Sequence, residues 1–384
     1  MEKWITRKIA DIADVVAGGT PNTGNSDFWN GDIGWITPAD LSGYKYRYIA
    51  HGSRNISNAG LNNSSACLLP KNTILLSSRA PIGYVAIAEK ELATNQGFKN
   101  LICDDTQVDY RFMYYWLQLN ADALKNFASG ATFPELSAGT VKKIKVTLPD
   151  MVIQNRIADI LFAYDELIEA NTRRIELLEQ TAQELYKEWF VRFRFPRYEN
   201  TKFENGIPKG WYYGKFKNEL TYNTGKLDSN AAVCDGEYSF YTCAKTVYKT
   251  NTFCFDGECV LLGGNNATGD FSLFYANEKL DAYQRTYIVV PQNPLLSCVY
   301  IYFVLKDYLL QFKTASIGAT TKFLTKGMLD KAKILIPDGK TIVRYNEMTK
   351  NMFDQIVALK SQNENLISQR DMLLPRLMSG KLEV

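Results

Sequence analysis

Gly130-Ala131-Thr132 recurs as Gly318-Ala319-Thr320, an offset of 188 in residue number (318 − 130), and the same offset carries a longer block of sequence with it. The residues that match without a gap are Leu136 and Leu324, Gly139 and Gly327, Lys143 and Lys331, Lys145 and Lys333, and Pro149-Asp150 and Pro337-Asp338. An ungapped block of this kind indicates an internal repeat. We interpret the chain as a tandem duplication.

Weaker matches extend the repeat upstream. They pair Leu75-Leu76 and Gly83 with Leu261-Leu262 and Gly269, Leu92 and Gln96 with Leu280 and Gln284, and Gly31, Thr37 and Ala39 with Gly236, Thr242 and Ala244. The offset of the last set has grown to 205 (236 − 31), so the first copy must carry extra loop residues.

A long amphipathic helix is predicted after each copy. Pro-Asp is a helix-start signature, and from about 153 to 189 apolar residues recur every three or four positions. At 1.5 Å per residue such a helix spans roughly 60 Å. A similar stripe follows Asp338 and is expected to be interrupted by Pro375.

Each stripe must be buried against something, and we expect the two helices to pack as an antiparallel coiled coil. The interface positions predicted are Ile157, Tyr164, Asn171, Leu178, Leu185, Trp189, Ile356, Leu359, Asn363 and Leu366. Asn171 and Asn363 fall near the middle of the stripes. They are either solvated positions or partners that face each other and fix the register.

The fold class predicted is α+β, with two mixed α/β domains in a tandem pseudo-repeat, each followed by its long helix. Runs rich in β-branched and aromatic residues predict strands, and the segments 110–119 and 299–309 predict short helices. The domain boundaries expected are 1–149, 150–195 for the first helix, 196–337, and 338–384 for the second helix.

Composition narrows the function classes. The 384 residues are 46% hydrophobic and 22% charged, which is ordinary for a globular protein, and the net charge of +3 permits nucleic-acid binding without requiring it. No apolar run is long enough to cross a bilayer and the start of the chain lacks a signal-peptide core, so we expect a cytoplasmic protein without membrane contact.

Catalytic motifs are missing, and we predict neither catalytic nor metal-binding residues. No phosphate-binding loop or dinucleotide-binding motif occurs, and a histidine-based triad could form only around His51. The seven cysteines indicate reduced thiols; four of them cluster but lack the paired spacing of a zinc site, namely Cys234, Cys243, Cys254 and Cys259.

What remains is a set of basic and amide side chains in predicted loops, suited to phosphates and base edges. The DNA-contact candidates are Lys45, Arg47, Arg79, Asn95, Gln96 and Lys99 in the first copy, and Lys226, Lys245, Asn265, Asn266, Gln284 and Lys322 in the second. Lys45-Tyr46-Arg47-Tyr48 alternates basic and aromatic residues, a pattern that suits contacts to phosphates and grooves.

Four motifs in order resemble the specificity subunit of type I restriction-modification systems. They are Trp35-Ile36-Thr37-Pro38-Ala39-Asp40-Leu41, Ser77-Ser78-Arg79-Ala80-Pro81-Ile82-Gly83, Ala93-Thr94-Asn95-Gln96-Gly97-Phe98-Lys99, and Leu148-Pro149 leading into Gln154-Asn155-Arg156-Ile157. The second copy departs from them: Gly263-Gly264-Asn265-Asn266 replaces Ser-Ser-Arg-Ala, and Tyr283-Gln284-Arg285 replaces Asn-Gln-Gly.

The resemblance implies a non-catalytic reader of double-stranded DNA. Each globular region would be a target recognition domain for one half of a bipartite, asymmetric site, and the helices would set the spacing and dock two methyltransferase subunits. Restriction/translocase subunits would join that complex. S-adenosylmethionine, ATP and magnesium would be bound by the partner subunits, with no cofactor in this chain.

Two other classes stay open at the level of sequence. The chain could be the recognition part or a fragment of a related fused restriction-methylation enzyme, which would need attached catalytic domains. It could also be a coiled-coil scaffold whose globular ends bind protein rather than DNA.

Overall fold

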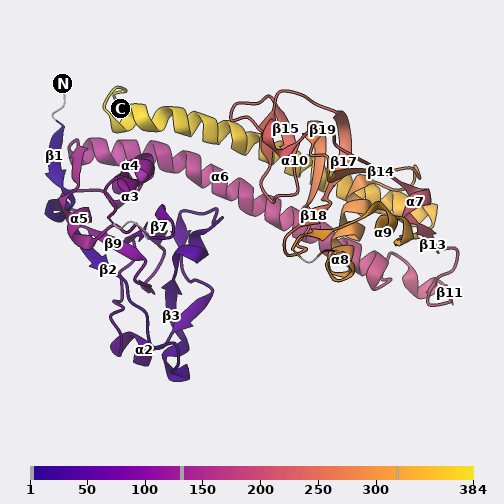
Figure 1. The fold of residues 1–384 in the computed structure, drawn as a ribbon, viewed down its shortest axis with the longest axis horizontal. Coiled ribbons are helices and arrows are strands. Elements are labelled where there is room, and N and C mark those ends of the chain that lie inside the picture. Colours follow the sequence, from indigo (N-terminus) through magenta and orange to yellow (C-terminus); the bar gives the residue numbers. More distant parts are fainter. Residues whose placement is uncertain (1–3, 130–133, 317, 319) are drawn as a thin grey trace. The chain divides into compact units, whose positions relative to one another are not determined.

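The computed structural model describes residues 4–129, 134–316, 318 and 320–384. Gly130-Ala131-Thr132 and Ala319 of the repeated motif lie outside the described residues. The chain forms two compact units: unit 1 comprises the residues up to Asn171 together with Gln362–Val384, and unit 2 comprises Thr172–Ser361. Both long helices, α6 (Met151–Tyr186) and α10 (Gly339–Met378), therefore contribute one part to each unit (Figure 1).

Unit 1 is built on three sheets. The main sheet has the order β2-β9-β6-β7-β4, a second has the order β5-β3-β8, and β1 pairs with β10. The strands are β1 (Ile5–Lys8), β2 (Ala13–Ala17), β3 (Trp29–Ile36), β4 (Tyr48–Ile49), β5 (Arg54–Ile56), β6 (Ile74–Ser78), β7 (Ile82–Ala88), β8 (Leu92–Thr94), β9 (Phe98–Cys103) and β10 (Lys145–Leu148). The short helices are α1 (Ile9–Ile12), α2 (Asn58–Asn62), α3 (Tyr110–Leu119), α4 (Ala121–Lys125) and α5 (Ala138–Lys143).

Unit 2 contains a six-stranded sheet of order β14-β20-β17-β19-β15-β16 and three strand pairs, β13–β22, β18–β21 and β11–β12. The strands are β11 (Phe203–Glu204), β12 (Ile207–Pro208), β13 (Tyr212–Lys215), β14 (Leu220–Thr224), β15 (Tyr238–Tyr241), β16 (Tyr248–Thr250), β17 (Phe255–Gly263), β18 (Asn265–Asn266), β19 (Leu273–Ala282), β20 (Thr286–Pro291), β21 (Lys322–Phe323) and β22 (Lys333–Ile336). The helices besides the long pair are α7 (Phe216–Glu219), α8 (Cys298–Ala315) and α9 (Lys326–Lys331).

Strand register confirms the repeat pair by pair. In unit 1, β3 runs parallel to β8 with Trp35 opposite Ala93. In unit 2, β15 runs parallel to β19 with Phe240 opposite Asp281. Trp35 and Phe240 are 205 positions apart, and Ala93 and Asp281 are 188 positions apart; these are the two offsets found in the sequence matches. The single strand β19 thus replaces both β7 and β8, and the two sheets of unit 1 become one continuous sheet in unit 2.

The extra residues of the first copy form two loops. The connection from Ile36 at the end of β3 to Arg54 at the start of β5 is much longer than its counterpart in the second copy, which runs from Tyr241 to Tyr248. The other insertion lies between β5 and β6 and includes α2. The expected growth of the first copy by loop insertion is confirmed.

Gly31 and Gly236 show why glycine recurs at matched positions. A Cβ on Gly31 would lie 2.5 Å from the Cα of Ser57, and one on Gly236 would lie 2.4 Å from the amide nitrogen of Thr250. Both positions face the neighbouring edge strand too closely for any side chain.

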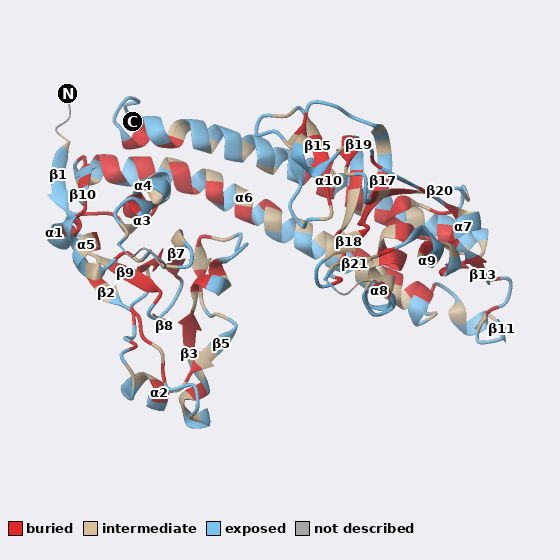
Figure 2. Cartoon of the chain, viewed as in Figure 1, coloured by how far each residue is buried: buried red, intermediate tan, exposed pale blue. Residues whose placement is uncertain are grey.

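The predicted helix pairing is confirmed within each unit. In unit 1, Asn171 of α6 donates from Nδ2 to Asn363 Oδ1 of α10 at 2.9 Å, and Arg370 pairs with Asp165 at 2.5 Å. In unit 2, Arg174 donates to Gln355 Oε1 at 2.9 Å. Because residue numbers rise along α6 as they fall along α10, the helices are antiparallel, and buried residues recur along both (Figure 2).

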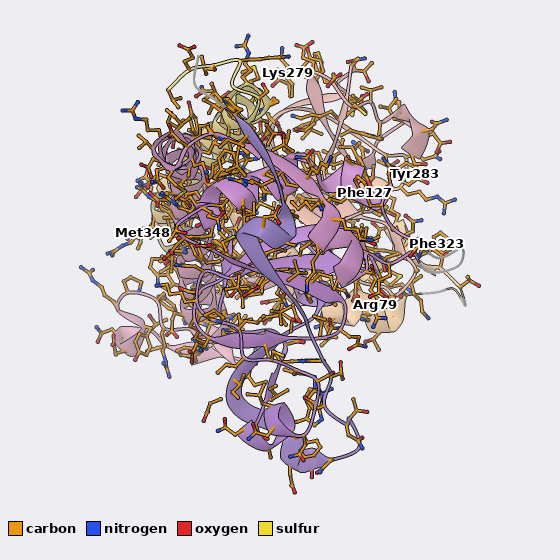
Figure 3. The ribbon with its side chains drawn as sticks, turned by 90° about the vertical axis from the view of Figure 1, so that its left-hand side faces the viewer. Arg79, Phe127, Lys279, Tyr283, Phe323 and Met348 are labelled. Atoms are coloured by element: carbon orange, nitrogen blue, oxygen red, sulfur yellow. The ribbon has the colours of Figure 1, made fainter. Side chains whose placement is uncertain are left out.

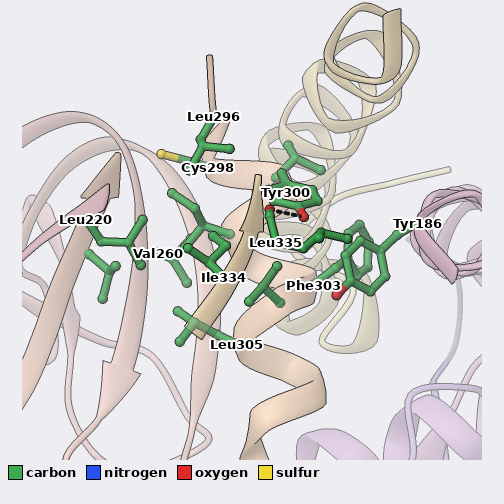
Figure 4. Close-up of a cluster of buried hydrophobic side chains, with 14 of the residues drawn as sticks. Tyr186, Leu220, Val260, Leu296, Cys298, Tyr300, Phe303, Leu305, Ile334 and Leu335 are labelled. Atoms are coloured by element: carbon green, nitrogen blue, oxygen red, sulfur yellow. Dashed lines mark hydrogen bonds between the residues drawn. The ribbon is translucent and has the colours of Figure 1, made fainter. Parts of the chain in front are cut away.

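The apolar core of unit 2 joins its sheet, α8 and the helix pair. Figure 4 shows part of this cluster, in which Tyr300 of α8 donates from its hydroxyl to the Leu335 carbonyl at 2.8 Å. Tyr186 of α6 stacks on Phe303 with ring centroids 5.6 Å apart. The side chains of Leu178 and Leu185 pack partly buried against the same cluster.

Both long helices begin directly after Pro-Asp, as the sequence predicted. Asp150 Oδ1 accepts from the Ile153 amide at 3.0 Å, and Asp338 Oδ1 accepts from the Lys340 amide at 3.0 Å, as expected for capping carboxylates. The expected interruption at Pro375 is wrong, because α10 continues to Met378. Pro375 lies in the last turn, so the helix loses the hydrogen bond of the missing Pro375 N–H, and only three helical residues follow it.

Candidate nucleic-acid interface

Three segments distant in sequence meet at the end of β6. The Ser78 amide donates to the Gly97 carbonyl at 2.7 Å, and the Ser78 carbonyl accepts from the Leu136 amide at 3.0 Å. The side chains brought together by these bonds form what we call the first loop cluster: Thr20, Arg79, Gln96, Lys99 and Glu135.

The first loop cluster is held by a carboxylate that contacts two cations. Glu135 Oε1 lies 2.9 Å from Lys99 Nζ, and Glu135 Oε2 lies 3.6 Å from an Arg79 guanidinium nitrogen. Lys99 is only 6% exposed and also donates to Ser78 Oγ, whereas Arg79 is partly exposed, and Gln96 is exposed and bonded to Thr20. Arg79, labelled in Figure 3, and Gln96 are thus the accessible polar ends of this cluster.

The second copy repeats this backbone framework with different side chains. The Gly264 amide donates to the Arg285 carbonyl at 2.7 Å, and the Gly264 carbonyl accepts from the Leu324 amide at 2.9 Å. The side chains assembled here form the second loop cluster: Asn265, Asn266, Gln284, Arg285, Lys322 and Phe323.

Within the second loop cluster, β18 pairs with β21 so that Asn265 lies opposite Phe323. The Arg285 guanidinium lies over the Phe323 ring at 5.1 Å, a cation–π contact, and Figure 3 labels Phe323. Asn266 Oδ1 accepts from the Thr268 amide at 2.8 Å. Asn265 Oδ1 is buried and accepts no hydrogen bond from the described residues.

Lys226 and Lys245 border this region. Lys226 is exposed beside Leu227, whose carbonyl accepts from the Gln284 amide at 2.9 Å. Lys245 is exposed and lines a cavity with Asp270 and Lys313. Hydrogen bonds from Lys313 and Thr268 lower the pKa of Asp270, so this carboxyl stays ionised and offsets part of the positive charge.

Two first-copy candidates are engaged within the protein. Asn95 Oδ1 accepts from the Gly97 amide at 2.9 Å, which closes a local turn. Arg47 is 5% exposed and bonds Glu169 of α6 through its backbone amide, Nε and Nη2. Burial acts to lower the pKa of Arg47, but the bonds and charge of Glu169 outweigh it and raise the pKa.

Arg47 therefore attaches its loop to α6, and its guanidinium is buried and bonded within the protein in this structure. The Arg47 guanidinium also lies 4.2 Å from the Phe162 ring centroid, and the neighbouring Tyr48 hydroxyl contacts that of Tyr110 at 3.0 Å. Only Lys45 of the basic-aromatic run is an exposed cation.

Among the helix candidates, burial divides the positions into two groups. The buried ones are Ile157, Asn171, Trp189, Ile356 and Leu359, and those of intermediate exposure are Tyr164, Leu178, Leu185, Asn363 and Leu366. Asn171 and Asn363 face each other, the second of the two interpretations that the sequence left open.

Within the described ranges, no group of three histidine, cysteine, aspartate or glutamate residues could hold a metal ion. None of the helices in those ranges combines the length and the apolar character that spanning a bilayer requires. All seven cysteines lie in those ranges as free thiols; burial raises the pKa of Cys259 to about 12.

Sequence reasoning missed Glu135 and Phe323 as members of the two clusters. Both precede the repeated leucines Leu136 and Leu324, so they occupy the same place in the repeat. Their partners, Arg79 and Arg285, lie on other loops, and no local pattern links them.

One relative is the type I restriction enzyme MjaIX specificity subunit of Methanocaldococcus jannaschii, which is 33% identical over 411 residues, covering 99% of this chain and 94% of the relative. The chain belongs to the specificity subunits of type I restriction-modification systems. The family model described as "Type I restriction modification DNA specificity domain" matches residues 1–180. The EcoDI specificity subunit of Escherichia coli is 31% identical over 180 residues, covering 46% of this chain and 39% of that one.

The fold of this specificity subunit agrees with a solved one. The crystal structure of the type I restriction-modification S subunit from M. genitalium superposes with a TM-score of 0.62 at 17% identity, covering 98% of this chain and 96% of that chain. The predicted family, fold class and role as a DNA specificity subunit are confirmed. As a specificity subunit the chain supplies DNA recognition to a type I complex, and catalysis is carried out by partner subunits.

Proposed function

We propose that the first and second loop clusters read the two halves of a bipartite, asymmetric DNA site. The observation that supports this most is the shared backbone framework: the same bonds assemble three loops in both copies, at Ser78 and at Gly264. The side chains mounted on that framework differ, which suits two different half-site sequences.

The chemistry of each cluster suits groove contacts. Arg79 offers a planar set of donors that matches guanine, and Gln96 offers an amide that matches adenine. In the second cluster, Asn265, Asn266 and Gln284 supply amides and Lys322 supplies a cation. Exposed Lys45, Lys226 and Lys245 contact phosphates, which fix orientation and make affinity depend on salt.

Asn95 and Lys99 act as supports in this proposal. Asn95 shapes the loop that carries Gln96, and Lys99 holds Glu135 from within the cluster. Their substitution is expected to affect the first half-site alone.

The helices set the distance between the half-sites and dock two methyltransferase subunits. Support for docking comes from large apolar side chains left exposed on them, such as Leu177 at 63% and Met372 at 62%. Restriction/translocase subunits complete the assembly in the cytoplasm. S-adenosylmethionine, ATP and magnesium are bound by these partners, with no cofactor in this chain.

Methylome sequencing of a host with and without the gene tests the proposal. We expect a bipartite adenine-methylation motif that disappears with the gene. In a host carrying Gln284→Ala, one half of the motif should relax while the other is unchanged. An unchanged methylome together with altered protein pull-downs would instead favour a scaffold.

The spacer role has a separate test. Inserting one heptad into α6 and one into α10 should lengthen the unread gap in the methylation motif while both half-site sequences remain. Recognition of the original gap with equal efficiency would contradict the spacer role.

A further inference from the structure

Glu135 is a carboxylate within a surface proposed to bind a polyanion. DNA phosphates repel a carboxylate, so such a residue weakens the electrostatic part of DNA affinity. Glu135 is not remote from the cluster: its side chain, 38% exposed, contacts Lys99 and Arg79, which are both DNA-contact candidates. A carboxylate in this place must contribute something other than affinity for phosphates.

The backbone of Glu135 is fixed on both sides. Its amide and carbonyl exchange hydrogen bonds with Ser129 at 3.0 and 3.1 Å, and the next residue, Leu136, donates to Ser78 at the end of β6. The buried Lys99 Nζ holds one carboxylate oxygen at 2.9 Å. The other oxygen is thereby aimed at the Arg79 guanidinium.

The second copy has a contact at the same place in the repeat, but between different residue types. The counterpart of Glu135 in the repeat is Phe323, and its ring lies under the Arg285 guanidinium at 5.1 Å. In both copies, then, the residue before the repeated leucine contacts an arginine on another loop of the cluster. An ion pair at 3.6 Å in one copy and a cation–π contact in the other each favour one location for a guanidinium.

We propose that Glu135 is a positioning residue that holds Arg79 in the orientation in which it reads a guanine of the first half-site, and that Phe323 holds Arg285 in the same way for the second. This rests on the proposed function of the two loop clusters. Arg79 keeps donors for a base because it has five N–H groups and Glu135 presents one oxygen to it. Lys99 neutralises the carboxylate, which reduces its repulsion of phosphates.

The test uses the assembled methyltransferase complex and a DNA library with both half-sites randomised, scored by methylation. Glu135→Gln should reduce discrimination at one guanine position of the first half-site by about 10-fold and leave the second half-site unchanged. Glu135→Asp, which keeps the charge, should retain most of the discrimination. Phe323→Leu is the matched variant and should relax only the second half-site.

A double variant separates positioning from direct reading. With Arg79→Met present, Glu135→Gln should cause no further change in base preference, because the residue that Glu135 orients is gone. A further change would mean that Glu135 reads a base itself and would overturn the proposal. An equal fall in methylation at all sites with unchanged preference would also overturn it, since that is the mark of a purely structural residue.

Should Glu135→Gln not assemble, Phe323→Leu carries the test in the second copy, because it removes the ring under Arg285. It should relax one position of the second half-site; an unchanged preference there would overturn the proposal. If the wild-type complex methylates no bipartite site, the proposed function fails and this inference with it. A wild-type bipartite motif with no response to these variants overturns the inference alone.

Discussion

The two copies attach their globular parts to the long helices through different kinds of contact, polar in the first copy and aromatic in the second. In the first, buried polar groups make the attachment: the Tyr115 hydroxyl donates to Asp165 of α6 at 2.5 Å, and Arg370 of α10 pairs with the same carboxylate. In the second, the counterparts of Tyr115 and Asp165 in the repeat are Phe303 and Phe353, whose ring centroids lie 6.0 Å apart.

The extra loop of the first copy adds a second polar attachment. Arg47 and Glu169 form a buried ion pair between this loop and α6, with side chains 5% and 10% exposed. The second copy lacks this loop, and Tyr275 contacts Phe353 instead, at 4.6 Å between ring centroids.

The difference shows that the repeat preserves contact positions and not contact chemistry. Apolar packing is non-directional and tolerates changes of shape, whereas a buried ion pair imposes one geometry and is costly if half of it is lost. We expect the first copy to be more sensitive to single substitutions at its attachment than the second.

Asp165→Ala should give the largest effect. It removes the acceptor of the buried Tyr115 hydroxyl and the buried partner of Arg370, which keeps only Asp371, and the free energy of unfolding should fall by about 4 kcal/mol. Chemical denaturation of the purified subunit measures it. The control replaces the whole set, Tyr115→Phe with Asp165→Leu and Arg370→Met. If this apolar set is no more stable than Asp165→Ala, the comparison between polar and apolar attachment breaks down.

Arg47→Met should reduce the free energy of unfolding by about 3 kcal/mol because it leaves Glu169 buried without its cation. The slope of the logarithm of DNA affinity against the logarithm of salt concentration should stay the same, since the Arg47 guanidinium is bonded to Glu169. Lys45→Met is the matched control two residues away: it should change the free energy of unfolding by less than Arg47→Met does, because Lys45 is exposed, and reduce that slope by about 1. A reduced slope for Arg47→Met would restore its role as a DNA contact.

Asn171→Leu should lower the free energy of unfolding by about 1–2 kcal/mol, because Asn363 Oδ1 loses the hydrogen bond that Asn171 donates. Adding Asn363→Ile supplies the apolar types found at the matched positions of unit 2, Leu359 and Ile175, and should recover the loss. Thermal unfolding of both variants measures this. A double variant as unstable as the single one would show that the asparagine pair stabilises the helices beyond satisfying its own groups.

Asp338→Ala should give the smallest effect, about 1 kcal/mol at neutral pH, from loss of the α10 cap. Burial acts to raise the pKa of Asp338, but hydrogen bonds from Thr341, Trp211 and the backbone outweigh it and hold the pKa below 3.8. The carboxylate therefore stabilises the fold above that ordinary value, and this contribution is lost as the pH falls through the lowered pKa.

Urea denaturation at several pH values checks the sign of this effect. The difference between wild type and Asp338→Ala should shrink as the pH falls below about 4. Asp150→Ala removes the corresponding cap of α6 and should cost a similar amount at neutral pH. A difference that grew on acidification would contradict the assignment of a stabilising carboxylate.

Patterns that depend on near neighbours were predictable from the sequence. The spacing of apolar residues predicted both long helices, and the predicted helix over 110–119 coincides with α3 (Tyr110–Leu119). The prediction for 299–309 identified α8 but was too short, since α8 runs from Cys298 to Ala315. The aromatic residues in it are compatible with either a helix or a strand when taken alone.

The candidate site was predictable only in part. Arg79, Gln96 and Gln284 lie on the loops that meet, and their motifs identified them. Arg47 belongs to a run typical of nucleic-acid binding, but its partner Glu169 lies far along the chain, on α6. A contact across that distance leaves no local pattern.

The sequence by itself determined the duplication, the two amphipathic helices and the family, because periodicity and ordered motifs are properties of the chain alone. Only the tertiary structure decided which cations are accessible and which are buried in ion pairs. That decision depends on backbone bonds that join distant loops, such as Ser78 to Gly97 and Leu136, and on the desolvation that follows when those loops close.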